Sequence, residues 1–179
     1  LIFFLSKNKK IFDNKIKNCI FTQFAHLDLK NDHIPSYWSN FKYLLNFKKI
    51  LWCFMYVKSD QFKTIEDLKI YLSKTKNKNI IFLHSLGSLS LITKSIFIYL
   101  QLLINFLLIK KKNKFKFKNY NLYYLFESDL IESFIGVSSI KNIFNFLLIN
   151  QFYKKFKLEK IFYLFENQPH EKYLNYIFK

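Results

Sequence analysis

Arginine is absent from this 179-residue chain, and glycine, proline and cysteine occur only twice each. A Walker loop or a dinucleotide fingerprint needs several glycines at fixed offsets, so both are excluded. The low glycine, proline and cysteine contents also exclude a collagen-like sequence and a disulfide scaffold. Because 51% of the residues are apolar, the composition is not that of a disordered chain. A chain of this length and composition can bury a core as one domain.

Lysine is in large excess, and Phe, Ile, Leu, Asn and Tyr dominate the remainder. All 29 basic residues are lysines, and with 12 acidic residues they give a net charge of +17. These residue types share A- and T-rich codons, which indicates an AT-rich genome, first that of a mitochondrion or plastid and second that of a reduced endosymbiont. Codon bias also favours Asp and Glu, so it does not explain the charge imbalance. A domain with a pI of about 9.7 is expected to bind a polyanion, first RNA and second an anionic membrane.

Few side chains have the spacing that metal or redox chemistry requires. Cys19 and Cys53 are far apart in the sequence and are expected to be two buried thiols. His26 and His33 lie near two aspartates, but they lack an i, i+4 helical pairing with a glutamate. We therefore expect no metal site and no cofactor.

The sequence also lacks a convincing catalytic constellation. Residues 84–90 read HSLGSLS, in which the second glycine of a G-x-S-x-G elbow is missing, so they are interpreted as a polar strand–helix junction. Glu127, Asp129 and Glu132 are interpreted as a solvated loop that balances nearby lysines rather than as a general acid and base. We therefore expect neither an enzyme nor a small-molecule substrate.

The hydrophobic pattern predicts an α/β sandwich, in which helices flank a small mixed sheet that contains a strand–helix–strand unit. Residues 50–57 form an unbroken apolar run, ILWCFMYV, which is typical of a buried strand. Thr64 and Asp67 have the spacing of a capping box and predict the start of a helix. Residues 80–83 supply the second strand, expected to run parallel to the first.

The remaining elements follow from local periodicity and turn residues. Residues 1–33 are expected to be an irregular basic extension, 34–155 the α/β domain and 156–179 a helical tail. Within them we predict a helix from Ser36, a long helix over 94–109, strands over 114–118 and 122–126, a turn at 127–129, a helix from Ser138 or Ser139 to about Tyr153, and a helix over 157–166.

The long helix leaves two interpretations open. Its apolar run, residues 95–109, has lysines at both ends and spans about 22 Å as a helix, short of the roughly 30 Å hydrocarbon core of a bilayer. Gln101 and Asn105 lie within it on one helix face. The length favours a buried helix of a globular domain, and a short membrane helix remains the alternative.

Two segments resemble a known family in their order of elements. In residues 54–85, an apolar strand and a polar turn precede a threonine-capped helix and a second strand; the helix begins Thr64-Ile65-Glu66-Asp67-Leu68-Lys69. Residues 112–148 read KNKFKFKNYNLYYLFESDLIESFIGVSSIKNIFNFLL. Both segments are similar to the ribosomal stalk-base protein, the large-subunit protein ten family. The resemblance covers about 36–150, and the basic-Asn-Thr junction of the family is replaced here by His84-Ser85-Leu86.

The resemblance implies a structural constituent of the large ribosomal subunit, which clamps an rRNA junction beside neighbouring ribosomal proteins. The family's C-terminal helix carries acidic stalk dimers, and residues 157–179 would correspond to it. Together with the composition, this predicts a mitochondrial ribosomal protein of the matrix. The alternative is a small accessory membrane subunit of a respiratory complex or ATP synthase, with a membrane helix near 94–109.

Lysine clusters are the expected RNA contacts. Lysine binds phosphate as a point charge, so it anchors RNA rather than reading its sequence. The predicted RNA-binding residues are Lys7, Lys9, Lys10, Lys42, Lys48, Lys49, Lys74, Lys76, Lys78, Lys110, Lys111 and Lys112.

Overall fold

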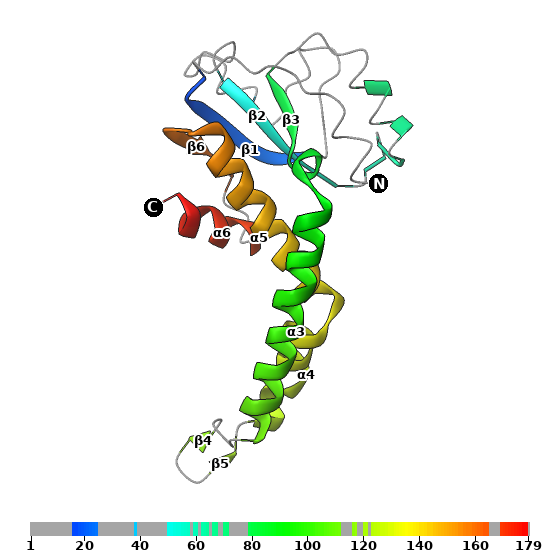
Figure 1. Ribbon diagram of the computed structural model, residues 1–179, viewed down its shortest axis with the longest axis vertical. Helices are drawn as coiled ribbons and strands as arrows, with labels where there is room; N and C mark the ends of the chain where they lie inside the picture. Colours follow the sequence, from blue (N-terminus) through cyan, green and yellow to red (C-terminus); the bar gives the residue numbers. More distant parts are fainter. Residues whose placement is uncertain are drawn as a thin grey trace.

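The molecule consists of a body built on a parallel sheet and a long helical arm that projects from it (Figure 1). The computed structural model describes residues 16–24, 38, 50–57, 59–60, 62–64, 66–67, 70–71, 79–111, 116–117, 120–121, 123–164 and 169–178. Its elements are β1 (Asn18–Phe24), β2 (Ile50–Tyr56), β3 (Ile80–Phe82), η3 (Leu83–Leu86), α3 (Leu89–Lys111), β4 (Lys116–Phe117), β5 (Tyr120–Asn121), α4 (Tyr123–Ile135), α5 (Val137–Phe156), β6 (Lys160–Phe162) and α6 (Pro169–Ile177).

The sheet has the strand order β3-β2-β1-β6, and all its neighbouring strands are parallel. The α/β class is therefore confirmed, as is the parallel pairing of the two strands around residues 50–83. The expectation of a mixed sheet is corrected, because the only antiparallel pair described, β4 with β5, forms a separate hairpin. A central parallel strand is covered on both faces, which explains why β2 is apolar along its length.

Two buried clusters cover the two faces of the sheet. On one face, Phe21, Cys53 and neighbouring strand residues pack against Leu148 and Phe152 of α5, and Leu174 of α6 joins them. On the other face, the strand residues include Trp52 and Phe54, and these pack with three side chains from the connecting segments: Trp38, Phe62 and Tyr71. Side chains from outside the sheet thus cover both of its faces, as a sandwich requires.

The N-terminal segment contributes more than the irregular extension that was expected. Residues 18–24 form β1, which lies between β2 and β6 and has Cys19 and Ile20 fully buried. The short apolar centre of this strand is flanked by polar residues, so its sequence pattern is weak. Partners from distant parts of the chain pair with both edges of β1 and stabilise it as a strand.

The expected C-terminal helix over 157–166 is wrong. Lys157 ends α5, and residues 160–162 form β6, which pairs with β1. Pro169 is the first residue of α6, where a missing backbone N–H has no cost.

The arm consists of α3 and α4, and it confirms one prediction and overturns two. The long helix exists and extends over Leu89–Lys111. Residues 122–126 were expected to be a strand and 127–129 a turn, but α4 begins at Tyr123 and continues through both. The aromatic run favours a strand by local propensity, whereas packing against α3 favours a helix: Phe134 contacts Phe106 with ring centroids 5.4 Å apart.

Other local predictions hold where the chain is described. Thr64 and Asp67 exchange hydrogen bonds, Thr64 N–H to Asp67 Oδ2 at 2.8 Å and Asp67 N–H to Thr64 Oγ1 at 3.2 Å, which is a capping box. The hydrogen bonds that the Thr64 backbone N–H and the Thr64 side chain make to the Asp67 carboxyl lower its pKa. The helix expected from Ser138 or Ser139 to about Tyr153 is present as α5, which begins at Val137 and ends at Phe156. The helix expected from Ser36 lies outside the described residues except at Trp38.

Candidate nucleic-acid interface

The end of α5 and the strand that follows it carry four lysines within seven residues, 154–160. Residues 152–165 read FYKKFKLEKIFYLF, so lysines alternate with aromatic and aliphatic residues. Lys154 and Lys155 lie in the last turn of α5, where the free backbone carbonyls stabilise positive charge. Lys157 caps the helix in the left-handed conformation, with φ 44° and ψ 49°. This cap ends the helix three residues before β6.

Backbone and side-chain contacts hold this segment on the N-terminal strand. The carbonyl oxygen of Lys17 accepts hydrogen bonds from the N–H groups of Glu159, at 2.8 Å, and Lys160, at 3.2 Å. In the parallel register, Asn18 then lies opposite Lys160. The Lys17 ammonium also forms an ion pair with the Glu159 carboxylate. Because both side chains of the pair are more than half exposed, we expect it to contribute little to stability.

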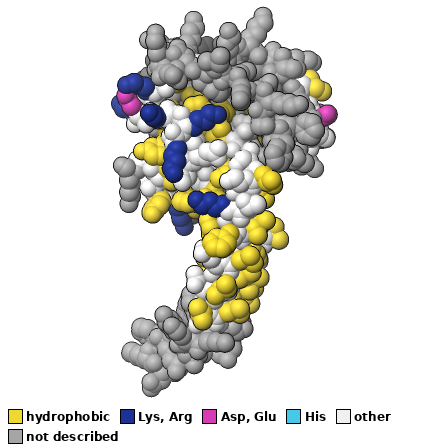
Figure 2. Space-filling model, in the orientation of Figure 1, with side chains coloured by type: hydrophobic (Ala, Val, Ile, Leu, Met, Phe, Trp, Pro, Cys, Tyr) yellow, Lys and Arg dark blue, Asp and Glu magenta, His cyan; other side chains and the backbone are white. Residues whose placement is uncertain are grey.

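Four lysines of this segment are exposed and form no salt bridge within the described chain: Lys154, Lys155, Lys157 and Lys160. We call these four residues the basic edge. The Lys155 ammonium lies over the Phe156 ring, 5.6 Å from its centre. Figure 2 shows lysine side chains gathered over the body, whereas the visible side of the arm is mainly hydrophobic. The basic edge therefore presents point charges of the kind that bind phosphates.

The predicted RNA-binding lysines fall almost entirely outside the described residues. Lys110 and Lys111 belong to the last turn of α3, at the far end of the arm from the sheet (Figure 1). The other ten predicted lysines are at positions that the structure does not describe: Lys7, Lys9, Lys10, Lys42, Lys48, Lys49, Lys74, Lys76, Lys78 and Lys112. The structure thus tests none of these side chains, and their contact with RNA remains a prediction.

The arm carries a second surface, of opposite character. Along α3, four large side chains recur at alternating spacings of three and four residues, with exposed fractions of 50–61%: Phe97, Leu100, Ile104 and Leu107. We call these four residues the apolar stripe. Leu89, Ile96 and Leu108 are also 44–62% exposed, so the same helix exposes seven large apolar side chains. One described helix, over Leu89–Leu108, is long and apolar enough to cross a membrane, and 11% of that window is buried.

The opposite side of α3 is packed rather than free. Phe106 is buried against α4, and the Tyr99 hydroxyl donates a hydrogen bond to the carbonyl of Ile135 at the end of that helix. Three carboxylates lie on α4, and Glu132 accepts a hydrogen bond from the Ser138 hydroxyl at 2.6 Å. The acidic residues expected in a loop therefore lie on a helix that runs beside α3.

Other candidate chemistry is placed as follows. Cys19 and Cys53 are free thiols and fully buried, as expected. Burial raises the pKa of both thiols, so neither is poised as a nucleophile. The junction at 84–90 connects β3 to α3, as expected for a strand–helix junction. The two histidines and two aspartates of the weak metal-type cluster lie outside the described residues, and no group of three metal-ligating side chains occurs within the described ranges.

No protein-family model matches the chain, and no curated protein or solved structure matches it either. Its function must therefore be argued from its own residues.

Proposed function

We propose that this chain is a structural constituent of a mitochondrial ribosome that binds rRNA through lysine–phosphate contacts, at the base of the large-subunit stalk. The observation that carries the RNA-binding part is the basic edge, with four exposed lysines and no acidic partner within the described chain. The net charge of +17 favours the same class of partner. The codon-biased composition supports the organelle, and the pattern resemblance supports the stalk base.

Fractionation of the organelle in mild detergent tests the ribosomal part of this proposal. The chain is followed by mass spectrometry through density gradients at moderate and high salt. We expect it to sediment with the large ribosomal subunit and to be released as salt rises, because salt screens phosphate contacts. Sedimentation with a respiratory complex or ATP synthase would contradict the proposal.

Charge reversal at the basic edge tests the RNA-binding part. A variant with Lys154→Glu, Lys157→Glu and Lys160→Glu is compared with the wild type on single-stranded RNA over a series of salt concentrations. Each lost phosphate contact lowers the slope of log affinity against log salt by about one, so the triple variant should lose two to three units of slope. Lys63→Glu, at an exposed position outside the basic edge, is the single-site control. An unchanged slope in the triple variant would remove the basic edge from the interface.

A membrane role is the second candidate, because the apolar stripe is exposed on a helix of sufficient length. The packing of the arm weighs against it. A bilayer around Leu89–Leu108 would also surround the part of α4 that contacts Phe106, including the exposed Glu132. A charged residue near the centre of a bilayer costs on the order of 3 kcal/mol. We therefore place the apolar stripe against a protein component of the particle instead of lipid.

Alkaline extraction of membranes separates these two candidates. A peripheral or ribosomal chain is released into the supernatant, whereas a chain with α3 in the bilayer stays in the pellet. Leu100→Lys, within the apolar stripe, sharpens the comparison because it places a charge on the surface that lipid would contact. Retention of the wild type combined with release of Leu100→Lys would establish the membrane role and overturn the ribosomal proposal.

A further inference from the structure

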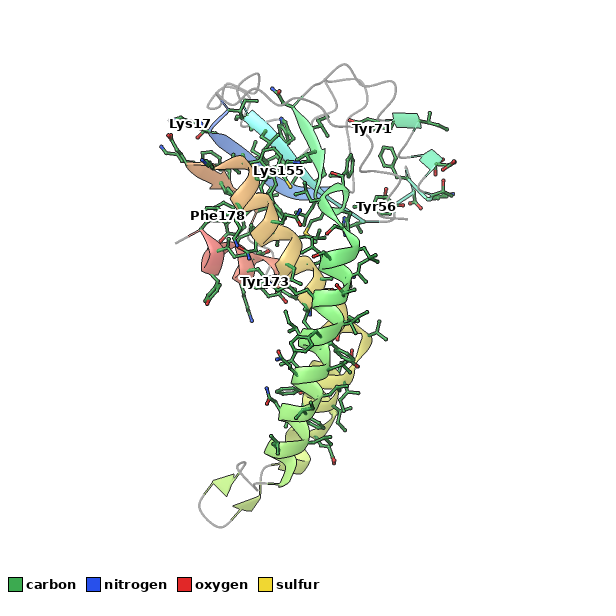
Figure 3. The ribbon with its side chains drawn as sticks, viewed as in Figure 1. Lys17, Tyr56, Tyr71, Lys155, Tyr173 and Phe178 are labelled. Carbon is green, nitrogen blue, oxygen red and sulfur yellow. The ribbon has the colours of Figure 1, made fainter. Side chains whose placement is uncertain are left out.

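A cavity of about 640 Å³ lies beside the basic edge, between α5, β6 and α6. Alternate residues of the β6 segment, Glu159, Ile161 and Tyr163, line it from one side, as the two-residue period of a strand requires. Asn175 and Phe178 line it from the α6 side. Figure 3 shows Phe178 at the end of α6, on the same side of the sheet as Lys155 of α5. The volume lies within the range of pockets that hold small organic groups.

The lining combines three aromatic rings and three aliphatic side chains with two polar groups. The Tyr163 hydroxyl donates a hydrogen bond to Asn175 Oδ1 at 2.8 Å, and the Asn175 amide also carries two N–H donors. Tyr153 contacts Phe178 edge to face, with ring centroids 4.7 Å apart, and Tyr153 is 38% exposed. A flat ring with hydrogen-bonding edges suits this lining better than an aliphatic ligand does.

The basic edge begins at the same residues that form the cavity. Lys154 follows Tyr153 directly, and Lys157 precedes the lining residue Leu158. Lys160 lies between the lining residues Glu159 and Ile161, so by the same two-residue period its side chain points to the other face of the strand. Phosphates bound by Lys154 and Lys157 would place their bases near the mouth of the cavity. Proteins that bind single-stranded nucleic acid combine the same two parts, a basic track for the backbone and aromatic side chains for the bases.

We infer that this cavity receives an unpaired base of single-stranded RNA, whose flanking phosphates lie on the basic edge. The base stacks on Tyr153, and its polar edge accepts hydrogen bonds from the Asn175 amide. The inference rests on the proposed RNA-binding function and adds to it a site for one base. The chain then binds an unpaired base of single-stranded RNA as well as its phosphates.

Two matched oligonucleotides test the inference on the full chain. One is a fluorescent single-stranded RNA of 12 nucleotides, and the other has the same number of phosphates but an abasic sugar at every position. Stacking of a base on an aromatic side chain contributes about 1–3 kcal/mol, so fluorescence anisotropy should show roughly 5- to 100-fold weaker binding of the abasic strand.

Variants of the lining residues then show whether the preference for the base-containing strand arises at the cavity. Asn175→Leu removes the amide at an exposed position, and Tyr153→Leu removes the stacking ring. Each should reduce the preference for the base-containing strand at least fivefold and leave the affinity for the abasic strand unchanged. Tyr176→Leu is the matched control, because Tyr176 lies on α6, is 71% exposed and does not line the cavity. Circular dichroism checks that each variant is folded. If Tyr153→Leu does not fold, Asn175→Leu alone tests the cavity.

The outcomes separate the two proposals. Equal binding of both strands, with salt-dependent affinity, would overturn the base site and leave the RNA-binding function standing. A preference that both cavity variants retain would also overturn the base site. Failure of both strands to bind at low salt would overturn the RNA-binding function, and the base site with it.

Discussion

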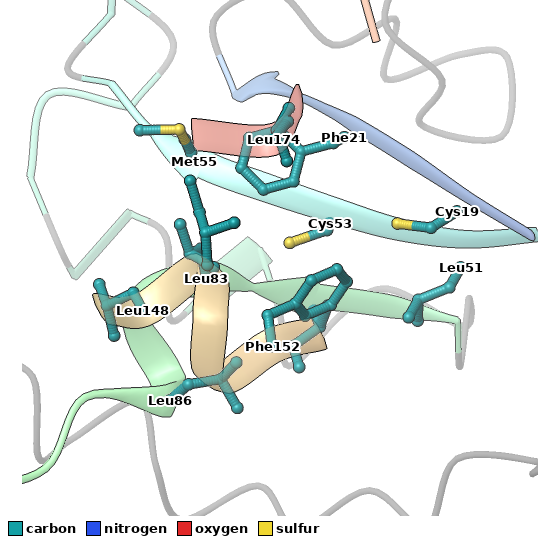
Figure 4. Close-up of a cluster of buried hydrophobic side chains, with 12 residues drawn as sticks. Cys19, Phe21, Leu51, Cys53, Met55, Leu83, Leu86, Leu148, Phe152 and Leu174 are labelled. Atoms are coloured by element: carbon teal, nitrogen blue, oxygen red, sulfur yellow. The ribbon is translucent and has the colours of Figure 1, made fainter. Parts of the chain in front are cut away.

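Phe21 of β1 and Phe152 of α5 pack edge to face, with ring centroids 6.4 Å apart and an interplanar angle of 63° (Figure 4). Both side chains are almost completely buried, with 1% and 0% exposed. The contact joins a strand near the start of the chain to a helix near its end. It lies in the cluster that covers one face of the sheet, so the two ends of the sequence share one core.

Removal of this contact should destabilise the whole body. Phe152→Ala leaves a cavity among side chains that cannot close around it, and we expect the free energy of unfolding to fall by about 3–5 kcal/mol. Urea denaturation followed by circular dichroism measures the loss. Phe97→Ala is the matched control, because Phe97 is 61% exposed on the apolar stripe and should change stability by less than about 0.5 kcal/mol. Similar losses of unfolding free energy in the two variants would show that Phe97 is buried in solution, against its exposed position on α3.

The sequence predicts best those elements whose pattern is set by burial alone. Residues 50–57 could be identified as a strand because a strand buried on both faces is apolar throughout. The long helix α3 could be identified because its apolar run exceeds the length of any strand. Thr64 and Asp67 could be identified because a capping box is a local contact. None of these depends on distant residues.

The elements that were missed depend on partners far along the chain. β6 has only three residues and pairs with a strand about 140 positions earlier, so no local pattern marks it. The aromatic start of α4 has the composition of a strand, and its contact with α3 decides otherwise. The candidate site has the same dependence, because the cavity beside Lys154 and Lys157 forms only when β6 pairs with β1. The feature of the sequence that marks the basic edge is the alternation of lysine with aromatic residues in 152–165.

Lys157 offers a test of the helix end at the basic edge. Its left-handed backbone, with φ 44°, is unfavourable for any residue with a Cβ. Lys157→Gly should therefore raise the free energy of unfolding by about 0.5–1 kcal/mol. Lys155→Gly removes the same charge from a helical position and should lower it by a similar amount. Urea denaturation measures both changes. A more stable Lys157→Gly together with a less stable Lys155→Gly supports the left-handed cap, and destabilisation by both variants would contradict it.

His84 should make stability depend on pH. Burial lowers the pKa of its imidazole, and the positive charge of Lys141 lowers it further. The unfolded chain then binds a proton near pH 6.5 while the folded chain does not, so stability is complete above that pH and falls as pH decreases below it. The urea midpoint of the wild type should therefore drop between pH 7.5 and 5.5 by more than that of His84→Gln. An NMR titration of the imidazole should show a higher pKa in Lys141→Gln, and an unchanged pKa would remove Lys141 as a cause.

The two cysteines should report on opening of the sheet. Cys19 and Cys53 lie on neighbouring strands, face the α5 side together and are fully buried (Figure 4). Burial raises the pKa of both thiols, so at pH 8 neither supplies the thiolate that reacts with disulfide reagents. We expect almost no labelling of the native wild type and reaction of both thiols in urea, following the unfolding transition. Ser128→Cys, at an exposed position on α4, should add one thiol that reacts at once without urea. Rapid labelling of the native wild type would mean that β1 and β2 separate from α5 far more often than a closed core allows.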